Sequence, residues 1–174
     1  MASGEGAGMR MKRLLLALVV GTAWVSWAAE TLPATEGESL TGHRVVLREA
    51  MRGHASILIG SFSKDAGAGC AEWAKAIRAD AQLKSVTVYQ AVMLEQAPGL
   101  VRGMIKSALR RQVPAAEQDN FVVLIKDEKL WRSYFEVSDD KDPYVVLMDG
   151  SGQTLWHGHG AAGNLETLVR AALR

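Results

Sequence analysis

Cys70 is the only cysteine of this sequence and its most reactive type of side chain. A lone cysteine cannot form a disulfide within its own chain, so disulfide bonds do not hold the fold together. The thiol follows the Gly- and Ala-rich segment 63–69 and begins a predicted helix, where backbone N–H groups and the helix dipole lower a thiol pKa. Three interpretations remain open: a small packing residue, a monothiol redox group and a metal ligand.

His157 and His159 form the second group that could do chemistry. They are two residues apart, so in an extended strand they point to the same side. Together with Cys70 they could hold a soft or borderline metal, but two imidazoles alone make a weak site. Gly158 and Gly160 are equally typical of a turn with solvated histidines. We therefore predict no resident metal, and the absence of a phosphate-binding glycine loop predicts no nucleotide cofactor.

A predicted helix over 98–113 is amphipathic, with an apolar face and a basic face. The basic face consists of Arg102, Lys106, Arg110 and Arg111. Such a face can contact anionic lipid or an acidic partner, or it can simply be solvated. The formal net charge of the whole chain is only +1, which gives no indication of nucleic-acid binding.

The first 28 residues are typical of a secretory signal peptide. Arg10, Lys12 and Arg13 precede the apolar stretch 14–25, and a cut after Ala28 would have small residues on its amino side. We expect export to the periplasm or secretion, with the alternative of an uncleaved N-terminal anchor that leaves the domain facing the periplasm.

The remaining chain divides into a polar lead-in over 29–42 and one domain over 43–174. Its predicted strands and helices alternate along the chain. The strands are expected at 43–47, 55–62, 86–94, 121–125, 144–148 and 153–157, and the helices at 70–83, 98–113, 128–135 and 164–173. This order predicts a three-layer α/β/α sandwich with a mostly parallel sheet, closed by an antiparallel C-terminal hairpin at the turn 149–152.

This layout resembles the thioredoxin-like fold with the additional βα unit found in exported thiol-disulfide oxidoreductases. A buried strand ends at Phe62, and a Gly-rich segment then leads to the helix that carries Cys70. Pro143 precedes the next-to-last buried strand, where that fold keeps a cis-proline beside its active site. The segment 144–156 is similar to the closing hairpin of the family. The resemblance implies a binding groove formed by Pro143, Trp73 and Gly67.

The same resemblance raises a difficulty for redox chemistry. Counted from Phe62, Cys70 falls where the exported oxidoreductases have their second, resolving cysteine, and Gly67 falls at the nucleophile. Dithiol exchange requires both thiols. In this register Gly67 stands in place of the nucleophilic cysteine, so the chain lacks the attacking thiol.

A narrower resemblance is to the mitochondrial ATP synthase assembly factors. The matching segments are Phe62-Ser63 with Trp73, the run Leu109 to Pro114, the strand Tyr144 to Asp149, and the run Trp156 to Ala161. That family acts as a chaperone-like factor for a membrane-embedded subunit. The resemblance implies a protein partner, one that could be membrane-associated.

Three functions follow from these observations. The first is an exported thioredoxin-fold binding module without a CxxC pair, acting as a non-redox accessory, chaperone or assembly factor. The second is a monothiol oxidoreductase that uses Cys70 as its catalytic residue beside Pro143. The third is a metal-delivery protein that uses Cys70 with His157 or His159.

Overall fold

The structure is a computed structural model that describes residues 31–173. The predicted signal peptide, residues 1–28, lies outside the described residues. None of the helices in the described part of the chain is long and apolar enough to span a bilayer.

A seven-stranded sheet forms the middle layer, in the order β2-β1-β5-β4-β3-β6-β7. Its strands are β1 (Glu36–Ser39), β2 (Arg44–Val46), β3 (Ser56–Ser61), β4 (Thr87–Met93), β5 (Phe121–Leu124), β6 (Tyr144–Met148) and β7 (Thr154–His159). β3, β4 and β5 pair in parallel, whereas β6 runs antiparallel to β3 and β7 antiparallel to β6. The predicted α/β/α sandwich with a closing antiparallel hairpin is therefore confirmed.

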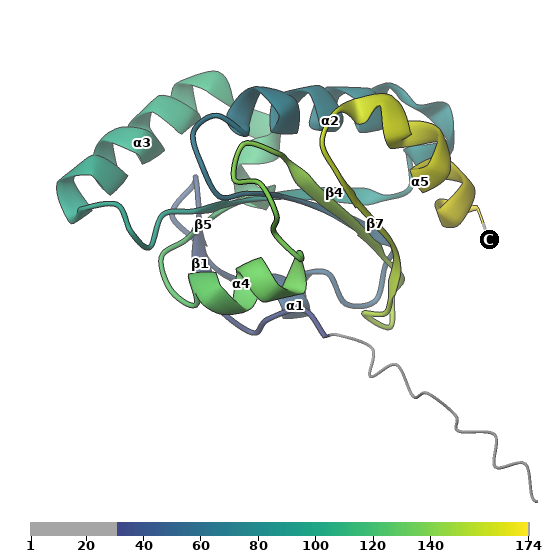
Figure 1. Cartoon of the computed structure of the whole chain (residues 1–174), viewed down its shortest axis with the longest axis horizontal. Helices are drawn as coiled ribbons and strands as arrows, with labels where there is room; N and C mark the ends of the chain where they lie inside the picture. Colours follow the sequence, from purple (N-terminus) through teal and green to yellow (C-terminus); the bar gives the residue numbers. More distant parts are fainter. Residues whose placement is uncertain (1–30, 174) are drawn as a thin grey trace, which may run out of the picture.

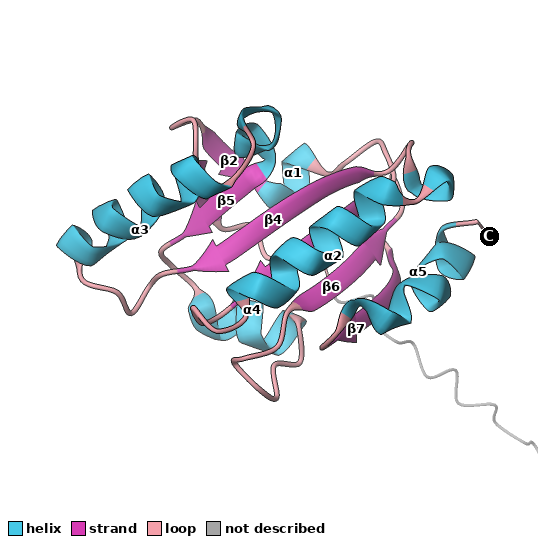
Figure 2. Cartoon of the chain, turned by 90° about the horizontal axis from the view of Figure 1, so that it is seen from above, coloured by secondary structure: helices cyan, strands magenta, loops and turns pink. Residues whose placement is uncertain are grey.

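Helices cover both faces of this sheet (Figure 1). The helices on one face are α2 (Gly67–Ala79), α3 (Gly99–Gln112) and α5 (Leu165–Ala172), and those on the other are α1 (Leu47–Ala50) and α4 (Glu128–Tyr134). Seen from above, α2 and α3 lie on either side of β4 (Figure 2). The short 3-10 helix η2 (Ala115–Asn120) connects α3 to β5.

The polar lead-in contains a strand that the sequence pattern does not predict. β1 pairs antiparallel with both β2 and β5, with Glu38 opposite Val123. Gly37 makes this close pairing possible, because a Cβ at that position would be 2.5 Å from a methyl carbon of Val122. The segment lacks the apolar alternation that identifies a strand, so its pairing depends on the distant β5.

The hydrophobic core differs between the two faces of the sheet. Under α1 and α4 one continuous cluster includes Leu58, Trp131 and Phe135. Under α2, α3 and α5 the core has two separate parts. One lies beneath α2 and α5 and contains Trp73 and Ile77, and the other lies beneath α3 around Phe121.

Candidate functional site

The helix that carries Cys70 begins three residues earlier than predicted, at Gly67. The Gly-rich segment was expected to be a loop, but Gly67 and Gly69 both adopt helical backbone. Cys70 is therefore inside the first turn, and its backbone N–H donates to the Ala66 carbonyl oxygen at 3.0 Å. Gly67 occupies the exposed first helical position, where a thiolate would face the free N–H groups.

The Cys70 side chain points from this turn toward the sheet. It is 7% exposed, and its thiol donates to the Gly60 carbonyl oxygen at 3.8 Å. Burial raises the pKa of the thiol to about 12, and a hydrogen bond with the Ser61 side chain offsets only part of this effect. Cys70 thus stays protonated at neutral pH, contrary to the activated thiol that a helix start favours.

Pro143 lies beside this turn, as the resemblance to the thioredoxin-like fold implies. A Cβ on Gly69 would be 3.0 Å from the Pro143 Cγ, so the two residues are in direct contact. The expectation of a cis-proline is wrong, because residues 31–173 contain no cis peptide bond. The trans isomer is the intrinsically favoured form of an X–Pro bond, and the Pro143 carbonyl accepts a hydrogen bond from Gly160 that continues the hairpin ladder.

Trp73 is a core residue and does not line a groove, which corrects the sequence-based assignment. It is 0% exposed, and its indole N–H donates to the Gly160 carbonyl oxygen at 2.7 Å. The buried face of α2 consists of Cys70, Trp73, Ala74 and Ile77. Ala71, two residues before Trp73, lies on the exposed side of the helix.

His157 and His159 do lie on one side of β7, but that side is remote from Cys70. They pair across the strands with Val146 and Tyr144, and both of these belong to the core on the α4 face. Cys70 packs in the core under α2, on the opposite face of the sheet. The sheet therefore separates the thiol from both imidazoles, and the shared metal site is not formed. Within residues 31–173 no cluster of three metal-ligating side chains exists.

His159 has a different set of neighbours. Its Nδ1 lies 2.8 Å from a carboxylate oxygen of Asp142, and its ring stacks on Tyr144 with 5.4 Å between the ring centroids. These contacts fix the imidazole at the start of the hairpin, which is a structural role.

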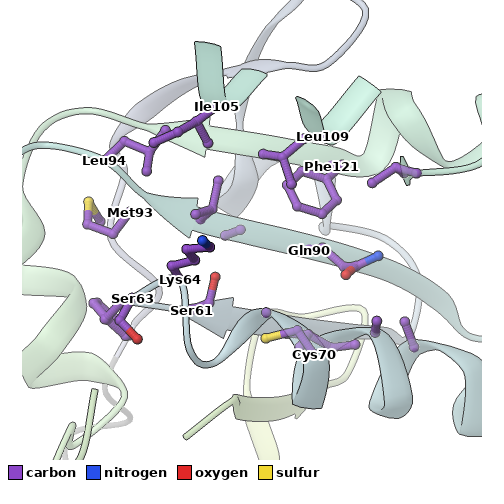
Figure 3. Close-up of a pocket in the computed structure, with 18 of the residues that line it drawn as sticks. Ser61, Ser63, Lys64, Cys70, Gln90, Met93, Leu94, Ile105, Leu109 and Phe121 are labelled. Carbon is purple, nitrogen blue, oxygen red and sulfur yellow. The ribbon is translucent and has the colours of Figure 1, made fainter. Parts of the chain in front are cut away.

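A large cavity, which we call the α2–α3 groove, lies between the two parts of the core described above. Its volume is about 620 Å³. Ala71, Ala74 and Arg78 of α2 form one wall, Ile105, Leu109 and Gln112 of α3 form the other, and Gln90, Val92 and Phe121 form the floor. Cys70, Ser61 and Lys64 also line it (Figure 3). The groove is therefore the place where Cys70 comes nearest to solvent.

Most of the charged groups along this groove are paired with one another. An ion pair of 2.5 Å between Arg78 and Glu117 connects α2 with η2. Arg132 binds Glu128 at 2.8 Å and forms two hydrogen bonds with the Asp140 carboxylate. The Arg132 guanidinium holds the pKa of Asp140 below its usual range. Among the groove-lining charges of the described chain, only Lys64 has no ion pair.

The basic face predicted for α3 is largely occupied by its own chain. Arg102 donates to the carbonyl oxygens of Leu94 and Glu95, Lys106 pairs with Glu38, and Arg110 donates to the Leu40 carbonyl oxygen at 2.5 Å. These contacts attach α3 to β1 and its neighbour Leu40, and also to the segment that precedes α3. Arg111 is exposed. An anionic surface would therefore meet fewer available cations than the sequence pattern indicates.

Two groove residues, Gln90 and Lys64, were not identified from the sequence. A signal for Gln90 was present, because it is the single amide within the apolar strand 86–94. Lys64 had no comparable signal: a lysine in a polar loop is usually solvated.

The comparisons with known proteins match this chain through its structure. No family model matches it, and no curated protein matches it. Solved structures do match it throughout the domain. DsbF of MTB superposes with a TM-score of 0.52 at 19% identity, covering 82% of this chain and 98% of that one.

Two further solved structures match the fold of this chain at similarly low sequence identity. A thiol:disulfide interchange protein of the thioredoxin family from Chlorobium tepidum TLS gives a TM-score of 0.52 at 14% identity, covering 83% and 96% of the two chains. BsSco, a member of the Sco family of cytochrome c oxidase assembly proteins, gives 0.54 at 14% identity, covering 82% and 92%. At these identities the matches establish a thioredoxin-like fold and nothing about activity. The chain is a thioredoxin-fold protein with a single buried cysteine and no CxxC pair.

Proposed function

We propose that this protein is a non-redox accessory factor, a chaperone or assembly protein that binds another protein. The observation that carries the proposal is the state of Cys70. It is the only thiol of the chain, it is buried, and its pKa is raised to about 12.

Thiol-disulfide exchange requires a thiolate that attacks and a second thiol that releases the product. With a pKa of about 12, the thiolate fraction of Cys70 at pH 7 is on the order of 10⁻⁵. The position that would carry the attacking thiol is Gly67. Both requirements are therefore missing, while the fold and its groove remain suited to binding.

One observation favours a monothiol oxidoreductase as the alternative function. Cys70 lines the α2–α3 groove, so a ligand in that groove can lie close to the sulfur. This alternative requires the ligand to raise the thiolate population by several orders of magnitude, and no cation contacts the sulfur in the described chain.

Three features support the finer proposal of an exported assembly factor. The sequence resembles the mitochondrial ATP synthase assembly factors, and a structural neighbour, BsSco, is a member of a family of oxidase assembly proteins. Residues of the resembling segments hold the fold together, since Trp73 bonds to Gly160 and Arg110 to Leu40. The signal-like residues 1–28 support a location outside the cytoplasm.

Reaction with glutathione disulfide and iodoacetamide at neutral pH tests the non-redox proposal. We expect no mixed disulfide with the folded chain and rapid alkylation only after denaturation. In cells that lack the gene, the Cys70→Ser variant should restore the wild-type phenotype as well as the unchanged gene does. Rapid mixed-disulfide formation by the folded chain, or loss of function in Cys70→Ser while the variant still folds, would refute it.

A further inference from the structure

We propose that the α2–α3 groove binds an apolar peptide segment of a partner protein, with Gln90 pairing to a peptide group and Lys64 to an adjacent acidic group. This inference rests on the proposed function and names its binding site. The groove is present because the core on this face is divided, and Gln90 lies between the two parts (Figure 3).

Gln90 is the first observation that indicates a ligand. It pairs with Ile59 on one side and Phe121 on the other, so its side chain projects from the floor of the groove. The side chain is 9% exposed, and its amide group forms no hydrogen bond within residues 31–173. An unpartnered side-chain amide on the floor of a groove offers a ligand both a donor and an acceptor. A peptide group presents the same two functions and satisfies both.

Lys64 is the second observation. It comes from the β3–α2 loop, and its ammonium group extends toward β4 at the mouth of the groove (Figure 3). The other charges that line the groove already form ion pairs, Arg78 with Glu117, and Arg132 with both Glu128 and Asp140. A ligand with a carboxylate at this end would therefore gain an ion pair without displacing an existing one.

The exposed side of α3 extends the apolar surface beyond the groove. Val101 lies one turn before Ile105 on the groove-facing side of the helix. Leu100 and Met104, on the neighbouring stripe, are 82% and 66% exposed. Exposed apolar side chains that continue a groove are typical of protein–protein contacts. A small amphiphile would occupy only the groove and would leave the Gln90 amide facing hydrocarbon, which favours a peptide.

The dimensions suit a short segment. α3 has 14 residues and is therefore about 21 Å long, which an extended peptide of about six residues matches. The probe for the experiment is a synthetic peptide of about eight residues, built from leucine and alanine with one glutamate near an end. Binding is measured by fluorescence anisotropy of the labelled peptide added to the full chain.

A pair of tryptophan variants on α2 tests the location. Ala71→Trp adds an indole to an exposed lining residue of the groove, whereas Ala79→Trp adds the same group to an exposed residue of the same helix outside the lining. We expect Ala71→Trp to weaken peptide binding at least about tenfold by occupying the groove, and Ala79→Trp to leave it unchanged. Circular dichroism establishes that both variants are folded.

Two further variants test the proposed contacts. Gln90→Leu keeps an apolar floor but removes the amide, and we expect about fivefold weaker binding. Lys64→Glu should weaken binding of the glutamate peptide about threefold and strengthen binding of the same peptide with lysine in place of glutamate. Lys129→Glu, an exposed substitution on α4, is the matched charge control and should change neither.

Three results would overturn the proposal: peptide binding that Ala71→Trp does not weaken, an absence of peptide binding, or binding of palmitate or phosphatidylglycerol vesicles with no binding of the peptide. Each leaves the proposed function testable through Cys70→Ser, because that variant examines thiol chemistry and not the groove. Conversely, a redox-active Cys70 would refute the proposed function even if the peptide binds in the groove.

Discussion

Gly69 and Pro143 are in contact at the point where the first turn of α2 meets the start of β6, with only 3.0 Å between a Cβ built on the glycine and the Cγ of the proline ring. Alanine is normally preferred to glycine within a helix by about 1 kcal/mol. Here the proline is buried and its carbonyl is bonded to Gly160, so the ring cannot move aside without cost. Gly69→Ala should therefore destabilise the protein, by about 1 kcal/mol net of the helix preference.

Gly67→Ala is the matched control for this substitution. A Cβ at Gly67 has no atom within 4 Å and the residue lies in the same helical turn. Urea unfolding should show unchanged or increased stability, by up to about 1 kcal/mol. Equal effects of the two substitutions would show that the proline contact does not control this turn.

The buried thiol predicts a specific loss of stability at alkaline pH. The pKa of Cys70 rises from the ordinary thiol value of 9.0 to about 12 in the folded chain. Below pH 9 the thiol is protonated in both the folded and the unfolded state, so its contribution to stability is complete. Between pH 9 and 12 only the unfolded state loses the proton, and the free energy of unfolding should fall by about 1.4 kcal/mol per pH unit at most.

Cys70→Ala isolates this effect from the titration of lysines and tyrosines. The difference in unfolding free energy between the wild type and the variant should be constant up to pH 9 and should decrease above it. A difference that stays constant well above this pH would mean that the thiol is more accessible to water than its surroundings indicate.

The attachment of α3 gives a third prediction. No residue of α3 is fully buried, and the helix depends on polar contacts such as that from Arg110 to the Leu40 carbonyl. Arg110→Met leaves this carbonyl without its donor and should increase amide hydrogen exchange throughout α3, with little effect in β3 and β4.

Arg111→Met removes a neighbouring positive charge that is exposed, and it serves as the control. Its exchange rates should match those of the wild type. If both variants exchange alike, net charge and not the Arg110 contact governs the helix.

The separation of Cys70 from the histidines gives a fourth prediction. Because the sheet lies between them, Cys70→Ser should leave the affinity for Zn²⁺ or Cu⁺ unchanged in a chelator competition. A variant with both His157 and His159 replaced by alanine serves as the comparison. A loss of affinity shared equally by the two variants would require that all three side chains bind one ion.

Much of the fold was accessible from the sequence because its central strands are continuous apolar runs. The run 55–62 is typical of a strand buried on both faces, and β3 is fully buried. β1 could not be found in this way, because its residues EGES carry no such pattern and are ordered by a distant partner. The same holds for α1, which has only four residues.

The site was less predictable because it depends on which side of a helix faces the sheet. Trp73 and Ala71 lie about 200° apart around α2, and the packing of the helix on the sheet decides which of them is buried. The thiol of Cys70 could be placed at a helix start from sequence, but its burial depends on Gly60 and Ser61, on another element. The groove itself arises from the spacing of two helices that are separated by β4, which no local pattern encodes.

The pairing of β1 with β5 has a consequence for the order in which the protein folds. β1 is among the first strands to be synthesised, yet one of its two neighbours in the sheet is β5, which follows both α2 and α3 in the chain. Until β5 is available, β1 can pair only with the three-residue β2. Contacts between distant segments form slowly because the intervening chain must first be ordered. The nascent chain therefore carries an unpaired strand edge from the synthesis of β1 until that of β5, and completion of the sheet at that edge waits for β5.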